Sequence, residues 1–401
     1  MIVTPHQWDD GWLLVRKMQS RNDIEQGPIR PPSEATSLLI RATRNCPWNK
    51  CAFCHTYRNT KFELRSVDEI KEDIQRARDV ADEIRELSWK HGEAGRLSKR
   101  TVNLIYDRDE AYSDTARSIA AWLYYGGESV FIQDANSIIM KTDDLVEVLA
   151  FIKDKFPSVN RITSYCRSKT AARKSVEEFK KLKEAGLSRI HIGMESGSDA
   201  VLAFIKKGVT AADHIKGGRN IVEAGISLCE YVMPGLGGDR WSKEHAEETA
   251  NVINRINPDF VRLRTLHPVP GTDLFDMVER GDFVPIDDEE ILREIRRFID
   301  CLTGIETSLV SDHILNLLEE LNGKFPEDKE NLLAVIDKYF SLPPDERLIY
   351  RIGRRIGAYR GLADLSDQGM KDRVKSIIAQ YRGQNRDQLD KDLLKIMHRY
   401  I

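Results

Sequence analysis

The chain has 401 residues, of which 31% are charged and 41% hydrophobic, and its formal net charge at pH 7 is -3. This balance is ordinary for a globular protein and argues neither for nor against a nucleic-acid partner. The length predicts one large domain with an appendage, or two domains. No stretch approaches the ~18 apolar residues of a membrane helix, and residues 1–19 lack the pattern of a secretory signal.

Cysteine usage indicates the redox compartment. Three of the six cysteines lie between residues 46 and 54, whereas Cys166, Cys229 and Cys301 lie far apart. A secreted disulfide framework would be shorter and richer in cysteine. We therefore expect a cytoplasmic protein with reduced thiols and no membrane contact.

Short apolar runs alternate with amphipathic stretches between residues 37 and 275. Strands are expected at 37–42, 129–133, 161–166, 188–194, 227–233 and 259–264. Strand–helix units that recur about every 30 residues indicate a parallel sheet with right-handed crossovers. Because there are six such units rather than eight, the sequence predicts an α/β fold that forms a partial (β/α)6 TIM-like barrel.

The two ends of this pattern differ from its middle. The first unit is long and contains a further candidate strand, TVNLIY, at 101–106. Beyond about residue 285 the β-rich runs stop, and helices are expected at 289–304, 312–326, 330–346, 347–361 and 372–383. The sequence thus predicts an N-terminal extension (1–36), the barrel (37–284) and a helical C-terminal region (285–401).

The segment CPWNKCAFC, residues 46–54, places its cysteines at the spacing C-x4-C-x2-C. It follows the first expected strand, at the face where α/β barrels carry their chemistry. A zinc site needs four ligands, or three with an open position, and His55 is a poor fourth ligand because adjacent side chains diverge. Three thiolates on a four-iron cluster leave one iron open. We favour this iron–sulfur site over zinc and over a chance cluster of cysteines.

The cysteine loop carries a resemblance to a known family. With Phe53 just before the third cysteine, it resembles the cluster motif of the radical S-adenosylmethionine (radical SAM) superfamily. The commonest spacing in that family, C-x3-C-x2-C, has one residue fewer in the first gap. Residues 57–74, 191–210 and 268–275 are similar to the branch with Elp3-like, MiaB-like and coproporphyrinogen oxidase-like enzymes, and the resemblance covers about residues 37–280.

The resemblance implies a cofactor set and a reaction. Cys46, Cys51 and Cys54 would bind a [4Fe-4S] cluster, and S-adenosylmethionine (SAM) would bind the remaining iron. One electron from a flavodoxin- or ferredoxin-type donor would cleave SAM to a 5'-deoxyadenosyl radical under anaerobic conditions. That radical would abstract a hydrogen atom from the substrate. The protein would position the substrate and exclude water.

The family also has a GGE-like stretch that holds the methionyl amino group at the end of the second strand. The GGE at 126–128 precedes the run at 129–133, so it lies at the opposite end of that strand. The resemblance instead points to Gln133 and Asp134, where the run ends. The alternative for Asp134 is a cap on the turn before the next helix.

Further SAM contacts are implied at the ends of later strands. Ser164 is expected near the ribose and Arg167 near the methionyl carboxylate. Glu195 is expected to bind the ribose or the amino group, and capping the next helix is its alternative. Arg264 is either an anion contact or part of a surface ion pair, and the backbone near Leu266 is expected to meet adenine.

The substrate is the least specified part of the prediction. No second cysteine cluster follows the barrel, which argues against the sulfur-inserting relatives. The basic segment RIGRRIGAYR at 351–360 either contacts RNA phosphates or forms the polar face of a helix, and its acidic neighbours favour the helix. We expect a small-molecule substrate. The alternatives are an RNA-modifying enzyme and a non-catalytic protein that binds the cluster and a cargo.

Overall fold

A computed structural model describes residues 23–107 and 112–381 of the chain. The chain forms two compact units, and the boundaries between them fall after Pro47, Arg58, His191, Val222 and Ile226. Unit 1 contains residues 59–191 and the chain before Trp48, and unit 2 contains most of the later chain. Within the described residues, no helix is long and apolar enough to cross a membrane.

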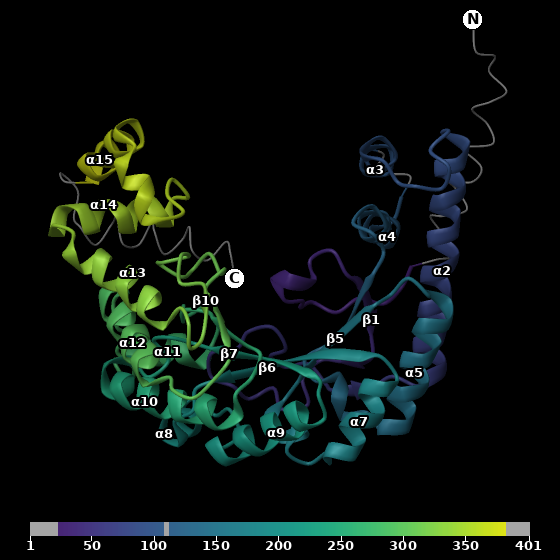
Figure 1. The fold of residues 1–401 in the computed structure, drawn as a ribbon, viewed down its shortest axis with the longest axis horizontal. Helices are drawn as coiled ribbons and strands as arrows, with labels where there is room; N and C mark the ends of the chain where they lie inside the picture. Colours follow the sequence, from purple (N-terminus) through teal and green to yellow (C-terminus); the bar gives the residue numbers. More distant parts are fainter. Residues whose placement is uncertain (1–22, 108–111, 382–401) are drawn as a thin grey trace, which may run out of the picture. The chain divides into compact units, whose positions relative to one another are not determined.

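The sheet of unit 1 is parallel. Its strands are β1 (Leu38–Arg41), β4 (Ser129–Gln133) and β5 (Arg161–Cys166), and β4 pairs in parallel with both of the others. The helices of this unit are α2 (Val67–Lys90), α3 (Lys99–Tyr106), α4 (Asp114–Tyr124), α5 (Thr142–Lys155), α6 (Ser168–Ala171) and α7 (Val176–Glu184). Figure 1 shows α2 running alongside α5, and these two helices pack against each other.

Helix α2 illustrates why these residues form helices. Its first residue follows Ser66, whose hydroxyl accepts from the backbone N–H of Glu69, while the Glu69 carboxylate accepts from the Ser66 N–H. This capping box satisfies donors that a helix start leaves unpaired. Ile70, Ile74 and Ile84 lie on the buried side of the helix. Apolar side chains at helical spacing therefore hold α2 in unit 1.

Strand β6 (Leu187–Glu195) passes through the boundary between the units. In unit 2, β7 (Ser227–Val232), β8 (Phe260–Leu263) and β9 (Ser308–Val310) are parallel, and β10 (Gly323–Lys324) is antiparallel to β9. The helices are α8 (Asp199–Phe204), α9 (Ala211–Glu223), α10 (Gly238–Ile256), α11 (Asp273–Arg280), α12 (Asp288–Cys301), α13 (Lys329–Ser341), α14 (Pro344–Arg355) and α15 (Gln368–Tyr381). The expected α/β class, with a mostly parallel sheet flanked by helices, is confirmed.

Three sequence expectations about these elements are wrong. Residues 101–106, expected as a strand, belong to α3, because the Ser98 hydroxyl caps the helix and Thr101 and Ile105 are buried at helical spacing. The β structure also does not stop near residue 285, since β9 continues the parallel sheet. The helix expected at 312–326 is a loop followed by β10, because the Asn316 side chain bonds to the backbone of Leu263 and Thr265.

The basic segment 351–360 is not a surface patch. Arg354 and Arg355 are buried and pair with Glu319 and Asp288. Burial opposes ionisation of Asp288, but the guanidinium charges of Arg355 and a neighbouring arginine outweigh it and lower the pKa of that carboxyl. Tyr359 is fully buried beside these side chains. The segment therefore serves the packing of unit 2, and the expectation of an RNA contact there loses its basis.

Candidate cluster and cofactor site

The cysteine loop leaves and returns through a two-stranded antiparallel ribbon, in which β2 (Thr43–Arg44) pairs with β3 (Glu63–Leu64). Cys46, Cys51 and Cys54 form no disulfide and are half-buried. Cys46 belongs to unit 1 and the other two to unit 2. In the described part of the chain, no three His, Cys, Asp or Glu side chains already surround a metal-sized centre. The fit of the loop to a cluster therefore rests on its donor set, three cysteine thiols outside any disulfide within nine residues.

Asp134 orients the start of this loop within unit 1. Its fully buried carboxylate accepts from the backbone N–H of Asn45 at 2.9 Å and pairs with the Arg41 guanidinium at 2.8 Å. Its second oxygen accepts from the N–H of Ala135 at 2.9 Å. This bond caps the turn that begins at Asp134. The predicted SAM contact of Asp134 stays a prediction. The contacts present support the capping alternative and add a link to the residue before Cys46.

The other predicted contacts of unit 1 also have protein partners. The Gln133 amide accepts from the Gly27 N–H at 2.8 Å and donates to the Ile29 carbonyl at 3.1 Å, so it fastens the chain before β1 to the end of β4. The Ser164 hydroxyl is fully buried and donates to a backbone carbonyl of β4 at 3.2 Å. The Arg167 backbone N–H donates to the Asn136 side chain at 2.9 Å. Together with Asp134, the residues Gln133, Ser164 and Arg167 therefore lie at the adjacent ends of β4 and β5.

In unit 2, Glu195 at the end of β6 forms an ion pair that the sequence did not suggest. Its carboxylate lies 3.0 Å from Lys207 Nζ, and the same ammonium lies 5.4 Å from the centre of the Phe53 ring. A Cβ at Gly193 would lie 2.3 Å from a Glu195 oxygen, so only glycine leaves room for this carboxylate. Phe53, between two cysteines of the loop, and Glu195 are thus joined through Lys207. The signal for Lys207 was its place in the KKG at 206–208.

The segment 205–208 also supports the cysteine loop. The Ala52 N–H donates to the Ile205 carbonyl at 2.8 Å, and the Trp48 indole N–H donates to the Lys206 carbonyl at 2.7 Å. Gly208 has a φ of 71°, and a Cβ there would lie 2.3 Å from the Trp48 ring. Glycine is required on both grounds. The segment therefore holds the loop through two backbone carbonyls and through the close approach of Gly208 to the Trp48 ring.

Arg264 and Leu266 follow β8. Leu266 is buried in the same apolar cluster against which Phe53 packs, and its N–H donates to the Pro234 carbonyl at 2.8 Å. Arg264 is exposed. Burial and the Arg264 charge together lower the pKa of His313 to about 4, so this histidine is neutral at pH 7. The predicted adenine and anion contacts of Leu266 and Arg264 stay predictions.

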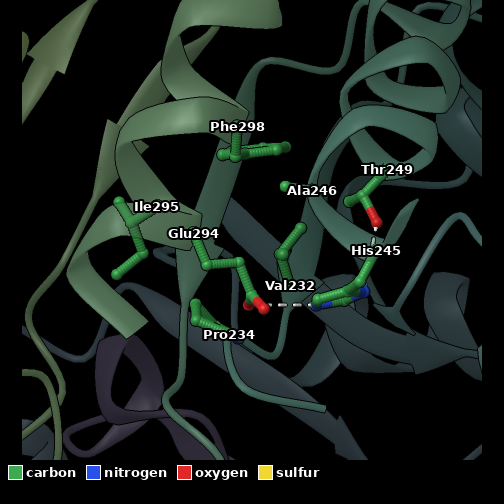
Figure 2. Close-up of a pocket in the computed structure, with 8 residues that line it drawn as sticks. All are labelled: Val232, Pro234, His245, Ala246, Thr249, Glu294, Ile295 and Phe298. Atoms are coloured by element: carbon green, nitrogen blue, oxygen red, sulfur yellow. Dashed lines mark hydrogen bonds and ion pairs between the residues drawn. The ribbon is translucent and has the colours of Figure 1, made fainter. Parts of the chain in front are cut away.

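A buried polar network around His245 joins the end of β6 to the loop after β7. Figure 2 shows His245 beside Glu294 and Thr249. His245 Nδ1 lies 2.8 Å from the Ser196 hydroxyl, and Nε2 lies 3.1 Å from the Met233 carbonyl. Because a carbonyl only accepts, Nε2 donates to Met233. Glu294 accepts from the Gly235 N–H at 2.6 Å and lies 3.7 Å from His245. Beside these groups is a cavity of about 10 Å³.

Glu230 on β7 is the second residue that the sequence did not single out. It is fully buried, and neither carboxylate oxygen has a hydrogen-bond partner among the described residues. Burial raises its pKa well above the ordinary value, the Glu195 charge raises it further, and the Lys207 charge opposes them. Burial thus favours the protonated form of Glu230. Its only sequence signal is a charged letter inside an apolar run, SLCEYVM.

Comparison with known proteins identifies the family. The model of the radical SAM superfamily matches residues 40–253, which is more than half of the chain. The chain belongs to the radical SAM superfamily. It is therefore an enzyme that uses a [4Fe-4S] cluster and SAM, as the cysteine loop predicts.

Individual relatives are distant. A tRNA uridine(34) acetyltransferase of Methanocaldococcus jannaschii is 26% identical over 121 residues, which are 30% of this chain and 22% of that protein. The chain thus spans less than a quarter of this curated relative. A biotin synthase of the same organism is 22% identical over 67% of this chain and 70% of its own length. Among solved structures, the methyltransferase TsrM of Kitasatospora setae, with cobalamin and a [4Fe-4S] cluster bound, has a TM-score of 0.44 and 10% identity, covering 90% of this chain and 67% of that one.

Proposed function

We propose that the chain abstracts a hydrogen atom from a small organic substrate, with SAM cleaved at a [4Fe-4S] cluster held by Cys46, Cys51 and Cys54. When bound, the cluster supplies the electron for reductive cleavage and SAM supplies the 5'-deoxyadenosyl radical. A flavodoxin- or ferredoxin-type donor would reduce the cluster. The observation that carries the proposal is the loop of three cysteines, in which Phe53 contacts Lys207 and Lys207 pairs with Glu195.

The residues of the chain bind and orient. Glu195 presents a carboxylate at the end of β6 for the amino or ribose groups of SAM, and Lys207 fixes its position at 3.0 Å. Asp134 holds the backbone at Asn45, one residue before Cys46. Glu294 and His245 hold the loop after β7 through Gly235 and Met233. Lys207 is thus a positioning residue, and Glu195 the proposed SAM contact.

The small-molecule substrate is favoured over RNA by the comparisons. The alignment that spans two thirds of both proteins is with a biotin synthase, an enzyme named for making a small molecule. The matches to tRNA uridine(34) acetyltransferases cover 22% and 23% of those proteins. The buried ion pairs of segment 351–360 also remove the basic patch that suggested RNA at that place. RNA modification therefore remains the second candidate.

An anaerobic assay tests the proposal. After reconstitution with iron and sulfide, the protein is mixed with SAM and dithionite, and 5'-deoxyadenosine is measured. Cys51→Ala should abolish the four-iron absorbance and the product. Cys166→Ala is the matched control, because Cys166 is buried and lies outside the loop. A single bound zinc with no iron–sulfur absorbance refutes the proposal, and a stable cluster that never cleaves SAM would favour the non-catalytic alternative.

A further inference from the structure

The turn between α2 and α3 in unit 1 is unusually well fixed for a surface turn. The Glu93 carboxylate accepts from the Ser98 N–H at 3.2 Å and from the Thr101 hydroxyl at 2.7 Å. The Ser88 hydroxyl, at the end of α2, donates to the Arg96 carbonyl on the far side of the turn. Hydrogen bonds from side chains on both helices thus hold the turn in one shape (α2 and α3 in Figure 1).

Trp89 stands on this turn with most of its surface in solvent. Its side chain is 65% exposed, the joint highest value among the large hydrophobic side chains described. The indole is nevertheless held, because a Cβ at Gly95 would lie 2.7 Å from the ring nitrogen, and the φ of Gly95 is 76°. A glycine in the left-handed region thus lets the backbone touch the edge of the ring. The result is a flat aromatic surface that is open to solvent and restrained along one edge.

The sequence next to this indole is rich in positive charge. Residues 89–100 contain four Lys or Arg and one Glu, a formal net charge of +3 in a chain whose net charge is -3. The side chains of Lys90, Arg96, Lys99 and Arg100 are exposed, and none of the carboxylates in the described part of the chain pairs with them. The single Glu is occupied by the hydroxyls of Ser98 and Thr101, which lower its pKa.

The position of two of these cations opposes helix stability. Lys99 and Arg100 occupy the first turn of α3, which contains no acidic residue. The N-terminal turn of a helix carries the positive end of its dipole, where carboxylates stabilise and cations do not. Their charge is therefore not explained by the folding of α3. It is suited to an anionic partner.

We propose that the Trp89 surface, formed by Trp89, Lys90, Arg96, Lys99 and Arg100, binds a single-stranded segment of RNA. A base would stack on the indole, and the four cations would contact phosphates, the combination that single-strand binding uses. An acidic protein would satisfy the cations but would bring no base to the restrained aromatic face. The inference goes beyond the proposed function, because this binding needs neither SAM nor turnover.

Binding is measured by fluorescence anisotropy of a labelled single-stranded RNA of twelve nucleotides with the cluster-loaded protein, without SAM or reductant. Trp89→Ala should weaken binding at least about 5-fold, as expected for the loss of one stacked base. The matched control is Tyr125→Ala, because Tyr125 is also 65% exposed but lies at the end of α4. The control should bind as the wild type does.

Charge is tested by Lys99→Ser combined with Arg100→Ser. Loss of two phosphate contacts should lower the slope of log affinity against log salt by about 1.4, since each contact to a single strand contributes about 0.7. Because the two cations oppose the dipole of α3, this variant should unfold at the same or a higher temperature. The control, Lys180→Ser with Lys216→Ser, removes two exposed lysines elsewhere.

Several outcomes would overturn the proposal. They are an unchanged affinity of Trp89→Ala, equal losses in Trp89→Ala and Tyr125→Ala, and an unchanged salt slope in the Lys99, Arg100 variant. Displacement of the RNA by poly-glutamate as efficiently as by unlabelled RNA of equal charge would point to an acidic protein partner instead. Because 5'-deoxyadenosine is not the readout, failure here leaves the proposed SAM chemistry standing, and failure of that chemistry leaves this surface standing.

Discussion

Replacing Glu230 with glutamine should stabilise the folded chain at neutral and alkaline pH, although it removes a native side chain. The wild-type carboxyl is fully buried without a hydrogen-bond partner, and burial raises its pKa well above the ordinary value of 4.5. In the unfolded chain the same group ionises freely. As pH rises from the unfolded pKa towards the folded one, the unfolded chain releases a proton that the folded chain retains, so stability is lost.

The magnitude follows from the linkage between pKa and stability. Each unit by which the folded pKa of Glu230 exceeds the unfolded one costs about 1.4 kcal/mol once the pH is above both. Glutamine keeps the shape but has no proton to release, so the gain in stability of Glu230→Gln should be almost nothing below pH 4 and should grow as the pH rises to 8. Urea unfolding followed by circular dichroism, at matched cluster content between pH 4 and 8, measures the difference.

Glu34 provides a control of opposite sign. It is equally buried, but its carboxylate accepts from the Ser37 hydroxyl at 2.6 Å and pairs with Arg161 at 3.1 Å. Burial raises its pKa, yet the bonds from His191 and Ser37 and the Arg161 charge outweigh burial, so the pKa is lowered. Its stabilisation is present above the unfolded pKa and is lost as pH falls through the folded pKa.

Glu34→Gln should therefore cost about 1.5 to 3 kcal/mol at pH 7, as expected for bonds to a charged group. The cost should shrink as the pH falls. The reasoning is refuted if Glu230→Gln is less stable than the wild type at pH 8. It is equally refuted if the difference in unfolding free energy between Glu230→Gln and the wild type does not grow with pH. Either result would mean that the Glu230 carboxyl is ionised and paired in the folded chain.

Three further substitutions test the site. Gly208→Ala should lower the iron bound per chain after reconstitution, because the added Cβ would lie 2.3 Å from the Trp48 ring and displace it. Iron analysis measures the loss. A full iron content would show that the Trp48 ring does not support the cysteine loop. His245→Ala should cost about 1 to 3 kcal/mol of unfolding free energy, since it leaves buried polar groups unpaired, and should raise the KM for SAM; an unchanged KM would limit His245 to a structural role. Lys207→Met should raise the KM for SAM more than it lowers kcat, with partial recovery in Lys207→Arg, because the Glu195 carboxylate loses its partner at 3.0 Å. An equal fall in kcat and kcat/KM would instead implicate Lys207 in the chemical step.

The features of this protein that the sequence predicts correctly are those determined by short stretches of chain. Apolar runs at regular spacing indicated the parallel α/β fold, and the spacing of Cys46, Cys51 and Cys54 indicated the family. The secondary structure was predicted wrongly where β-strand propensity and helix capping favour different structures. In TVNLIY, β-branched residues suggested a strand, but the hydroxyl of Ser98 caps a helix there.

The contacts that shape the candidate site join residues that are far apart in the sequence. Lys207 reaches Glu195 only because α8 turns the chain back towards the end of β6. The pKa of Glu230 is raised because packing removes the carboxyl from water, and the charged letter inside SLCEYVM does not by itself show that burial. The positive charges of 351–360 are compatible with a surface patch in the sequence alone. In the structure, Arg354 pairs with Glu319 and Arg355 with Asp288, two residues from distant segments. Hydrogen bonding and solvation depend on neighbours in space, and those neighbours are set by tertiary packing.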